Sequence, residues 1–196
     1  MLEACVQQLG LFGSVPAVFV DDETGKIAYY PALLAPDESR RLFDRLANTL
    51  SWTQETMWMY DHTVTVPRLI ARFDQSQARP AELANLQDRV EKFLGERFNT
   101  VSLQYYRDHN DSVAWHSDHT EELIENATVA IVSLGAARDM LIRSKARPRR
   151  TIARTLEPGS LFVMGGRAQD FWEHHIPKLR QPLGPRISVA LRQKAL

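Results

Sequence analysis

The chain has 196 residues, enough for one domain with a sizeable core and too few for two comfortable ones. Its hydrophobic fraction of 44% is ordinary for a globular protein, and its 24 basic residues balance its 24 acidic ones, so global charge gives no support for nucleic-acid or membrane binding. The single cysteine excludes an intramolecular disulfide and a cysteine-built metal site.

The start of the chain, residues 1–13, lacks the basic segment and long apolar run of a signal peptide. No apolar stretch in the sequence approaches the length that crosses a bilayer. Together with the single cysteine, these features predict a cytoplasmic location and no membrane partner.

Two segments of the first half predict helices. One follows Pro36, where Asp37 is placed to cap the first turn, and the other begins near Pro80 and runs to about Phe98. Each carries apolar residues at helical spacing and is therefore expected to pack one face against a core. These residues are Leu42, Phe43, Leu46 and Leu50 in the first segment and Leu83, Leu86, Val90, Phe93 and Leu94 in the second.

From residue 99 onward, short apolar or alternating runs are separated by turn formers, which predicts strands. The candidate strands are residues 101–106, 113–115, 127–134, 140–143, 161–164 and 186–191. Many short strands with little helix between them favour a jelly roll or another closed β architecture. We therefore predict one α+β domain over residues 1–196, in which a helical N-terminal part, residues 1–98, packs on a β core, residues 99–196.

His116 and Asp118 form the most informative pair for chemistry. Residues two apart in an extended strand point to the same side, so an imidazole and a carboxylate can meet one ion there. A second histidine from a distant strand would complete the two-histidine, one-carboxylate face used by non-haem Fe(II) oxygenases. His174 and His175 are both candidates, and because neighbours in a strand face opposite sides, at most one should point inward. The remaining histidines, His62, His109 and His119, lie in polar, turn-like surroundings and are expected at the surface.

Residues 186–192 alternate between two faces. Arg186 and Arg192 share one face with small residues between them, a pattern that suits either solvent exposure or bidentate binding of a carboxylate in a cavity. Gln104 and Tyr106 also share a strand face, shortly before His116, where they are either hydrogen-bond partners of a bound acid or ordinary barrel residues. A dicarboxylate cosubstrate beside iron needs a fixed cation, which favours the binding interpretation of the arginines.

At these positions the sequence resembles the AlkB family of 2-oxoglutarate- and Fe(II)-dependent dioxygenases, and the resemblance covers most of the chain. Its blocks occur in the family's order and spacing. They are residues 25–31, the Pro67-Arg68 pair, residues 98–108, residues 111–113 with His116-Ser117-Asp118, residues 133–138, residues 158–161, residues 172–178 and residues 185–192.

The resemblance implies a double-stranded β-helix fold, related to the jelly roll, and a site for Fe(II), 2-oxoglutarate and O2. It implies that His116, Asp118 and His174 bind iron, the last through the family's Trp-x-His-x-x-Pro-Lys pattern. It further implies that Arg186 binds the distal carboxylate of 2-oxoglutarate, that Tyr106 and Gln104 hydrogen-bond it, and that Arg192 lines the same pocket. The implied chemistry is decarboxylation of the cosubstrate to succinate and CO2, coupled to hydroxylation of a C–H bond.

Three positions depart from the family pattern, and all of them bear on the pocket. Gln104 stands where an asparagine is usual, Thr120 replaces an acidic residue although Glu121 and Glu122 follow, and residues 72–74 replace the usual lid sequence.

The expected function is oxidative demethylation of alkylated nucleobases in single-stranded or damaged DNA or RNA, as in repair. The alternative is hydroxylation of a small molecule, amino acid or protein side chain. A basic run is either a solvated loop or a surface that holds phosphates and so favours nucleic acid, and three aromatic residues are candidates either for stacking on a base or for core packing. The run consists of Arg143, Lys145, Arg147, Arg149, Arg150 and Arg154, and the aromatic residues are Trp58, Tyr60 and Phe73.

Overall fold

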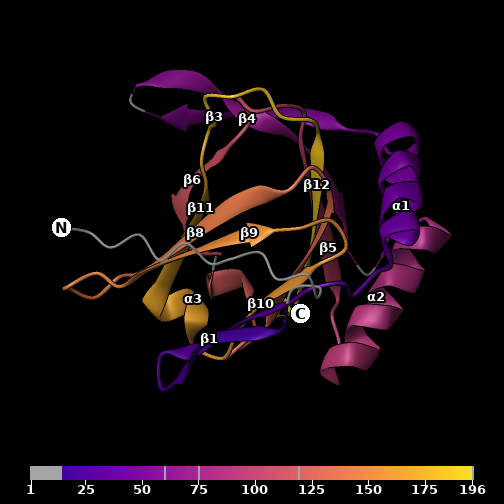
Figure 1. Cartoon of the computed structure of the whole chain (residues 1–196). Coiled ribbons are helices and arrows are strands. Elements are labelled where there is room, and N and C mark those ends of the chain that lie inside the picture. Colours follow the sequence, from indigo (N-terminus) through magenta and orange to yellow (C-terminus); the bar gives the residue numbers. More distant parts are fainter. Residues whose placement is uncertain (1–14, 60, 75, 119, 196) are drawn as a thin grey trace.

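The computed structural model describes residues 15–59, 61–74, 76–118 and 120–195, and within these residues the strands form two antiparallel sheets (Figure 1). The large sheet has the order β1-β2-β10-β7-β12-β5-β4-β3, and the small sheet has the order β6-β11-β8-β9. The large sheet contains β1 (Ala17–Asp22), β2 (Gly25–Tyr30), β3 (Thr53–Met59), β4 (His62–Phe73), β5 (Thr100–Tyr106), β7 (Val129–Gly135), β10 (Leu161–Gly165) and β12 (Arg186–Arg192). The small sheet contains β6 (Val113–His116), β8 (Arg138–Ser144), β9 (Thr151–Leu156) and β11 (Trp172–Ile176).

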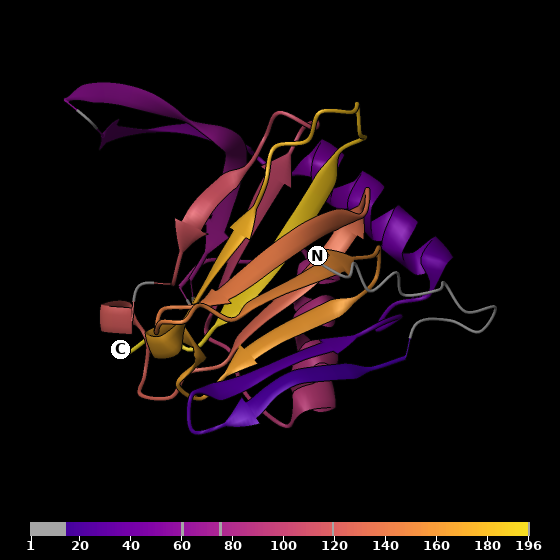
Figure 2. The same cartoon turned by 60° about the vertical axis from the view of Figure 1, so that its left-hand side comes forward.

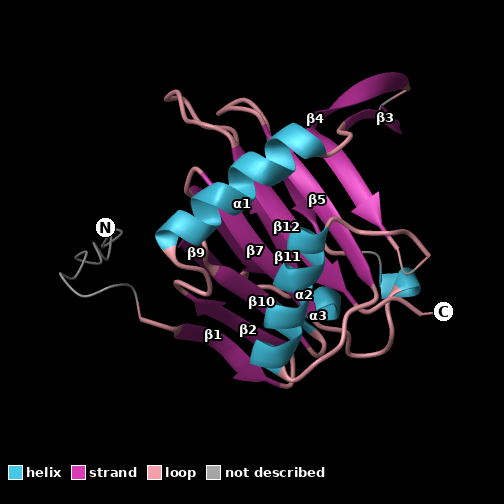
Figure 3. Ribbon diagram, turned by 90° about the vertical axis from the view of Figure 1, so that its right-hand side faces the viewer, coloured by secondary structure: helices cyan, strands magenta, loops and turns pink. Residues whose placement is uncertain are grey.

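Helices α1 (Pro36–Thr49) and α2 (Ala81–Leu94) lie side by side on the outer face of the large sheet (Figure 3). Both predicted helices are confirmed, and the second ends before Phe98 because Gly95 adopts a left-handed conformation with φ of +73°. The expected cap at Asp37 is wrong: Ala35 is the N-cap residue, and the Asp37 carboxylate accepts a hydrogen bond from Arg40 instead. A one-turn helix, α3 (Ala168–Phe171), and a 3-10 turn, η1 (Thr120–Glu122), complete the elements.

The molecule has two apolar layers, one on each face of the large sheet. Leu42 and Leu46 of α1 and Leu83 of α2 pack on the outer face. Side chains between the sheets, such as Ile131 and Phe162, form the second layer. The α+β class and the two-sheet, jelly-roll-like arrangement expected from the sequence are thus confirmed.

Among the described residues up to 98, the chain is less helical than expected. Strands β1 to β4 belong to the same sheet as the core strands, with β2 bonded to β10 and β4 bonded to β5. Strands β9 and β11 also lie outside the predicted set, whereas β5, β6, β7, β8, β10 and β12 are confirmed to within a few residues. The β3–β4 hairpin projects from the body of the molecule (Figure 2). In the described part of the chain, no helix combines the length and apolarity needed to span a bilayer.

The alternation of side chains along β12 decides which of its residues face the cavity between the sheets. Ile187, Val189 and Leu191 are fully buried in the layer under the helices. Because side chains alternate along a strand, Arg186 and Arg192 project to the opposite face, between the two sheets, where both line a cavity. The interpretation that put these arginines in solvent is therefore wrong.

Candidate active site

Three residues predicted to bind metal lie together between the sheets. His116 is the last residue of β6, Asp118 lies two residues later, and His174 lies in the neighbouring strand β11. His116 and His174 are directly paired across the two strands, and their ring centroids are 4.2 Å apart. One ligand atom from each of the three residues lies within 4.8 Å of those of the other two. That spacing matches the requirement for a single ion bound by all three.

His175 faces the other way. Its Nδ1 atom lies 2.5 Å from the Val113 carbonyl oxygen, and its ring stacks on Trp115 with centroids 5.1 Å apart. The opposite orientation of His174 and His175 follows from the strand alternation expected for neighbours. Among the other histidines, His62 is exposed and His109 is half-buried, both away from the cluster, and His119 lies outside the described residues.

The two clustered histidines are suited to metal binding because both are neutral at pH 7. Burial lowers the pKa of His174 to about 3, and burial also lowers the pKa of His116. His116 Nδ1 lies 2.8 Å from the Ala114 carbonyl oxygen, so Nδ1 carries the proton and Nε2 is left as an acceptor. Nδ1 of His174 is buried and has no hydrogen-bond partner among the described residues.

Asp118 is held ionised by its neighbour Arg192. Burial alone raises the pKa of this carboxyl, but the Arg192 charge, then His174, the Arg192 hydrogen bond and His116, in decreasing order, lower it to about 2. Arg192 Nε donates to Asp118 Oδ2 at 2.7 Å, and Arg192 Nη1 donates to Ser102 Oγ at 2.5 Å. Arg192 therefore lines the cavity as expected, but its guanidinium orients the carboxylate of Asp118.

The stability of the metal-free protein is expected to fall as the pH drops below 6.5. His174 stays neutral in the folded state down to a pKa of about 3, whereas it is protonated near pH 6.5 when unfolded, so acid favours the unfolded state throughout this window. Each such proton costs about 1.4 kcal/mol per pH unit. Urea unfolding in the presence of a chelator should show this slope between pH 6.5 and 5, and His174→Leu should reduce it. Equal slopes for the two proteins would contradict the assignment of the slope to His174.

Arg186 is a buried cation at the inner end of the same cavity. Its side chain is 0% exposed, and burial lowers its pKa to about 10, so it remains charged at neutral pH. Nη2 donates to Ser133 Oγ at 2.9 Å, whereas Nε and Nη1 have no partner among the described residues. A buried charge with free donors is costly unless an anion pairs with it. The site therefore suits a carboxylate.

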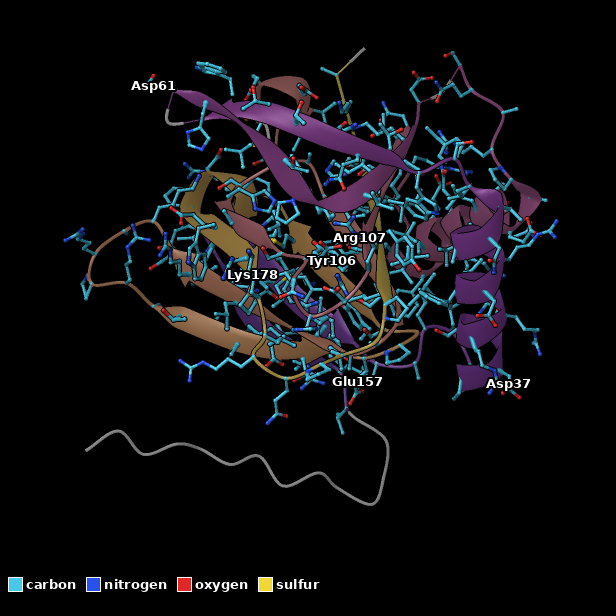
Figure 4. All side chains as sticks on the ribbon, turned by 90° about the horizontal axis from the view of Figure 1, so that it is seen from above. Asp37, Asp61, Tyr106, Arg107, Glu157 and Lys178 are labelled. Carbon is cyan, nitrogen blue, oxygen red and sulfur yellow. The ribbon has the colours of Figure 1, made fainter. Side chains whose placement is uncertain are left out.

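The cavity has a volume of about 530 Å³ and joins Arg186 to the metal cluster. Tyr106, 3% exposed, lies with its ring 5.2 Å from the Arg186 guanidinium carbon, and in the view from above it sits near the middle of the molecule (Figure 4). Gln104 also lines the cavity and donates to Ser102 Oγ at 3.0 Å. Thus the predicted residues Gln104, Tyr106, Arg186 and Arg192 all contact one cavity.

The mouth of the cavity carries charged side chains from distant segments. Arg68 reaches in from β4, and its Nε atom is buried without a partner in the described part of the structure. Glu122 lines the mouth and forms an ion pair with Lys194. An acidic group is therefore present although Thr120 replaces the usual one. In the altered lid segment, Arg72 pairs with Glu55, and Phe73 lines the cavity.

Most side chains of the predicted basic run contact the protein itself. Arg143 and Arg149 both pair with Glu173, and Arg150 donates to the Phe19 carbonyl. The other contacts are Lys145 to the Gln169 carbonyl and Arg154 over the Tyr29 ring. The run nevertheless remains at the surface of the β8–β9 hairpin, where residues 145–150 are exposed.

The aromatic candidates for base stacking differ in position. Trp58 is 71% exposed on the projecting β3–β4 hairpin, whose turn at Asp61 lies at the edge of the molecule (Figure 4). Phe73 is half-buried and packs partly on the core. Tyr60 lies outside the described residues.

Four residues of the site were not expected from the sequence. Ser102 and Ser133 hydrogen-bond the two arginines. Ser133 is a polar position on an otherwise apolar strand face, a signal that strand alternation could have provided, whereas Ser102 shares its face with Gln104 and Tyr106. Lys194 lines the cavity at its mouth, and Gln169 lies behind Asp118. Nothing in the local sequence indicates either placement.

Comparison with known proteins gives concordant results. The 2OG-Fe(II) oxygenase superfamily matches residues 70–192. The chain is 28% identical to human "Alpha-ketoglutarate-dependent dioxygenase alkB homolog 3" over 187 residues, covering 85% of this chain and 65% of the human protein. It is 35% identical to mouse "DNA oxidative demethylase ALKBH2" over 118 residues, covering 57% of this chain and 49% of that protein. The chain thus spans about two thirds or less of the length of these relatives.

Among solved structures, the fold is similar to that of the non-heme alpha ketoglutarate dependent epimerase SnoN from nogalamycin biosynthesis. The TM-score is 0.62 at 16% sequence identity, covering 86% of this chain and 77% of SnoN, and this likeness concerns the fold alone. The superfamily match extends over more than half of the chain, and both relatives named above carry AlkB-type names. The chain therefore belongs to the 2OG-Fe(II) oxygenase superfamily and, within it, to the AlkB family.

Proposed function

We propose that this chain is an Fe(II)- and 2-oxoglutarate-dependent dioxygenase that demethylates alkylated bases in DNA or RNA. The observation that carries the proposal is one cavity that joins the His116, Asp118 and His174 cluster to the buried Arg186 charge. Relatives named as alkB homolog 3 and as a DNA oxidative demethylase support the nucleic-acid substrate. The name DNA oxidative demethylase, carried by one of these relatives, also supports a role in repair.

The residues present fit the implied iron and cosubstrate. Two neutral imidazoles and one ionised carboxylate are the donor set of non-haem Fe(II) oxygenases and leave positions open for further ligands. The Nε and Nη1 atoms of Arg186, which have no partner among the described residues, offer two donors to the distal carboxylate of 2-oxoglutarate. Bound Fe(II), with 2-oxoglutarate and O2, supplies the oxidising power for hydroxylating a C–H bond.

The protein's own side chains bind and orient the reactants. Arg192 fixes the Asp118 carboxylate, and the Ala114 carbonyl holds the His116 ring in the tautomer that presents Nε2. Tyr106 and Gln104 line the same cavity as Arg186 and the cluster, where they serve as hydrogen-bond partners of the cosubstrate.

The cavity mouth has the polar groups that a methylated base needs. Glu122 supplies an acceptor for an exocyclic amino group, and Arg68 supplies a buried donor. Outside the mouth, Trp58 offers an exposed ring for stacking, and the β8–β9 hairpin offers cationic groups for phosphates. A base extruded from the strand would enter between these surfaces.

Incubation of the Fe(II)-loaded protein with 2-oxoglutarate, air and single-stranded oligonucleotides carrying methylated bases is expected to yield demethylated oligonucleotide and succinate in equal amounts. Mass spectrometry of both products measures this stoichiometry. The His116→Ala variant is the control and should form neither. If no methylated base in a broad panel reacts while a metabolite library stimulates succinate formation, the nucleic-acid substrate is wrong and a small-molecule hydroxylase remains.

A further inference from the structure

The main chain leaves the small sheet before it reaches Asp118. β6 ends at His116, which is the last residue paired with β11, so the N–H of Asp118 has no strand partner. Asp118 is 8% exposed, and a buried N–H without a partner would destabilise the fold. This N–H donates instead to the side-chain oxygen Oε1 of Gln169, at 2.9 Å.

Gln169 is itself fixed from several sides. Its side chain is 3% exposed, and its Nε2 atom donates to Met164 Sδ at 3.7 Å. Its main-chain carbonyl accepts a hydrogen bond from Lys145 Nζ at 2.8 Å. The helix turn α3 that carries Gln169 touches Gly25, where an added Cβ would lie 2.5 Å from Ala168 N. The amide oxygen is therefore presented to Asp118 by a rigid surrounding.

Asp118 differs in this respect from the two histidines. His116 and His174 are positioned by the β6–β11 ladder, whereas Asp118 lies beyond it. Two side chains replace the ladder: Arg192 binds the carboxylate at 2.7 Å, and Gln169 binds the main chain at 2.9 Å. Arg192 sets the direction of the carboxylate, and Gln169 sets the place from which it projects.

We infer that Gln169 is a positioning residue of the metal site, which holds the Asp118 backbone so that its carboxylate completes the three-ligand face. The inference rests on the proposed metal site at His116, Asp118 and His174. Partners of metal ligands that are lost by mutation typically weaken metal affinity by about 10- to 100-fold. Gln169 lies outside the cavity lining, so its loss should act through the metal and leave cosubstrate contacts in place.

The test is a Co(II) titration of the whole metal-free protein followed by visible absorption, because Co(II) reports both affinity and ligand geometry without turnover. Gln169→Leu removes the acceptor at similar size and is expected to raise the Co(II) dissociation constant by about 10- to 100-fold and to alter the absorption band. Gln169→Glu keeps an oxygen at the same distance and should retain tight binding.

The matched control is Gln87→Leu. Gln87 lies in α2, remote from the cluster, and donates to the Phe98 carbonyl at 2.7 Å. Its loss should lower thermal stability without changing the Co(II) absorption band or the Co(II) affinity. If Gln169→Leu does not fold, Gln169→Asn provides the same test, because an amide one carbon shorter no longer reaches the Asp118 N–H.

The outcomes separate the two proposals. If the wild-type protein binds no Co(II), or His116→Ala binds it equally well, the proposed metal site itself fails. If the wild type binds Co(II) through His116 while Gln169→Leu and Gln169→Asn bind it with unchanged affinity and spectrum, only the positioning role of Gln169 is overturned.

Discussion

Replacing His174 by alanine is expected to abolish 2-oxoglutarate turnover, whereas replacing its neighbour His175 should preserve it. His174 is 4% exposed and points at His116 and Asp118, while His175 lies on the other face of β11 against Trp115. Loss of one of three ligands should weaken metal binding by more than the roughly 10- to 100-fold that loss of a ligand's hydrogen-bond partner typically causes. Succinate formation and Fe(II) affinity are the measurements.

The two variants make a matched pair because each removes one imidazole from adjacent positions of the same strand. His175→Ala loses a ring stack worth about 0.5–1.5 kcal/mol, so its melting temperature should fall while its Fe(II) affinity stays at the wild-type value. Loss of metal binding in His175→Ala together with its retention in His174→Ala would reverse the assignment of the third ligand.

Replacing Arg186 by methionine is expected to have opposite effects on cosubstrate binding and on stability. The dissociation constant for 2-oxoglutarate should rise by about 30- to 5000-fold, because removing one member of a buried, hydrogen-bonded charge pair costs about 2–5 kcal/mol. Without cosubstrate, however, the variant should be as stable as the wild type or more so, since an uncompensated buried charge has been removed.

Thermal unfolding with increasing 2-oxoglutarate measures both effects at once. The wild-type midpoint should rise with ligand concentration, and that of Arg186→Met should start at the same value or higher and then stay flat. Arg40→Met is the control, because Arg40 pairs with Asp37 at the surface and such pairs contribute little. A wild-type response to 2-oxoglutarate in Arg186→Met would remove Arg186 from the cosubstrate site.

Much of the site was predictable because its residues follow strand alternation. Arg186 and Arg192 lie at an even spacing within one strand, so they had to share a face. The same rule predicted that His116 and Asp118 lie together, although Asp118 lies just past the end of β6. Which face of residues 186–192 was buried depended on the second sheet. The alternation alone was equally compatible with Arg186 and Arg192 lying in solvent. The pairing of Arg192 with Asp118 joins residues 74 apart in sequence and has no local signal.

The strands of the N-terminal part were missed for physical reasons. β3 reads Thr53–Met59 at one edge of the large sheet, with Met57 and Trp58 exposed, so it has no alternation of buried and solvated positions to detect. β9, in the second half of the chain, does alternate, but its solvent-facing side and its three polar positions leave little apolar signal. Gln169 is a buried polar residue on a single helical turn, and composition predicts such a residue at the surface.

The place of β12 in the large sheet has a consequence for how the protein is made. This strand follows every other described strand in the sequence, yet it lies between β7 and β5 and is bonded to both. On the ribosome, the strands on either side of it therefore remain two unjoined groups until residues 186–192 have been synthesised. Because these residues include Arg186 and Arg192, a nascent chain stalled before them lacks both the charge proposed to bind cosubstrate and the guanidinium that orients the Asp118 carboxylate. The proposed oxidation would thus require the complete sheet.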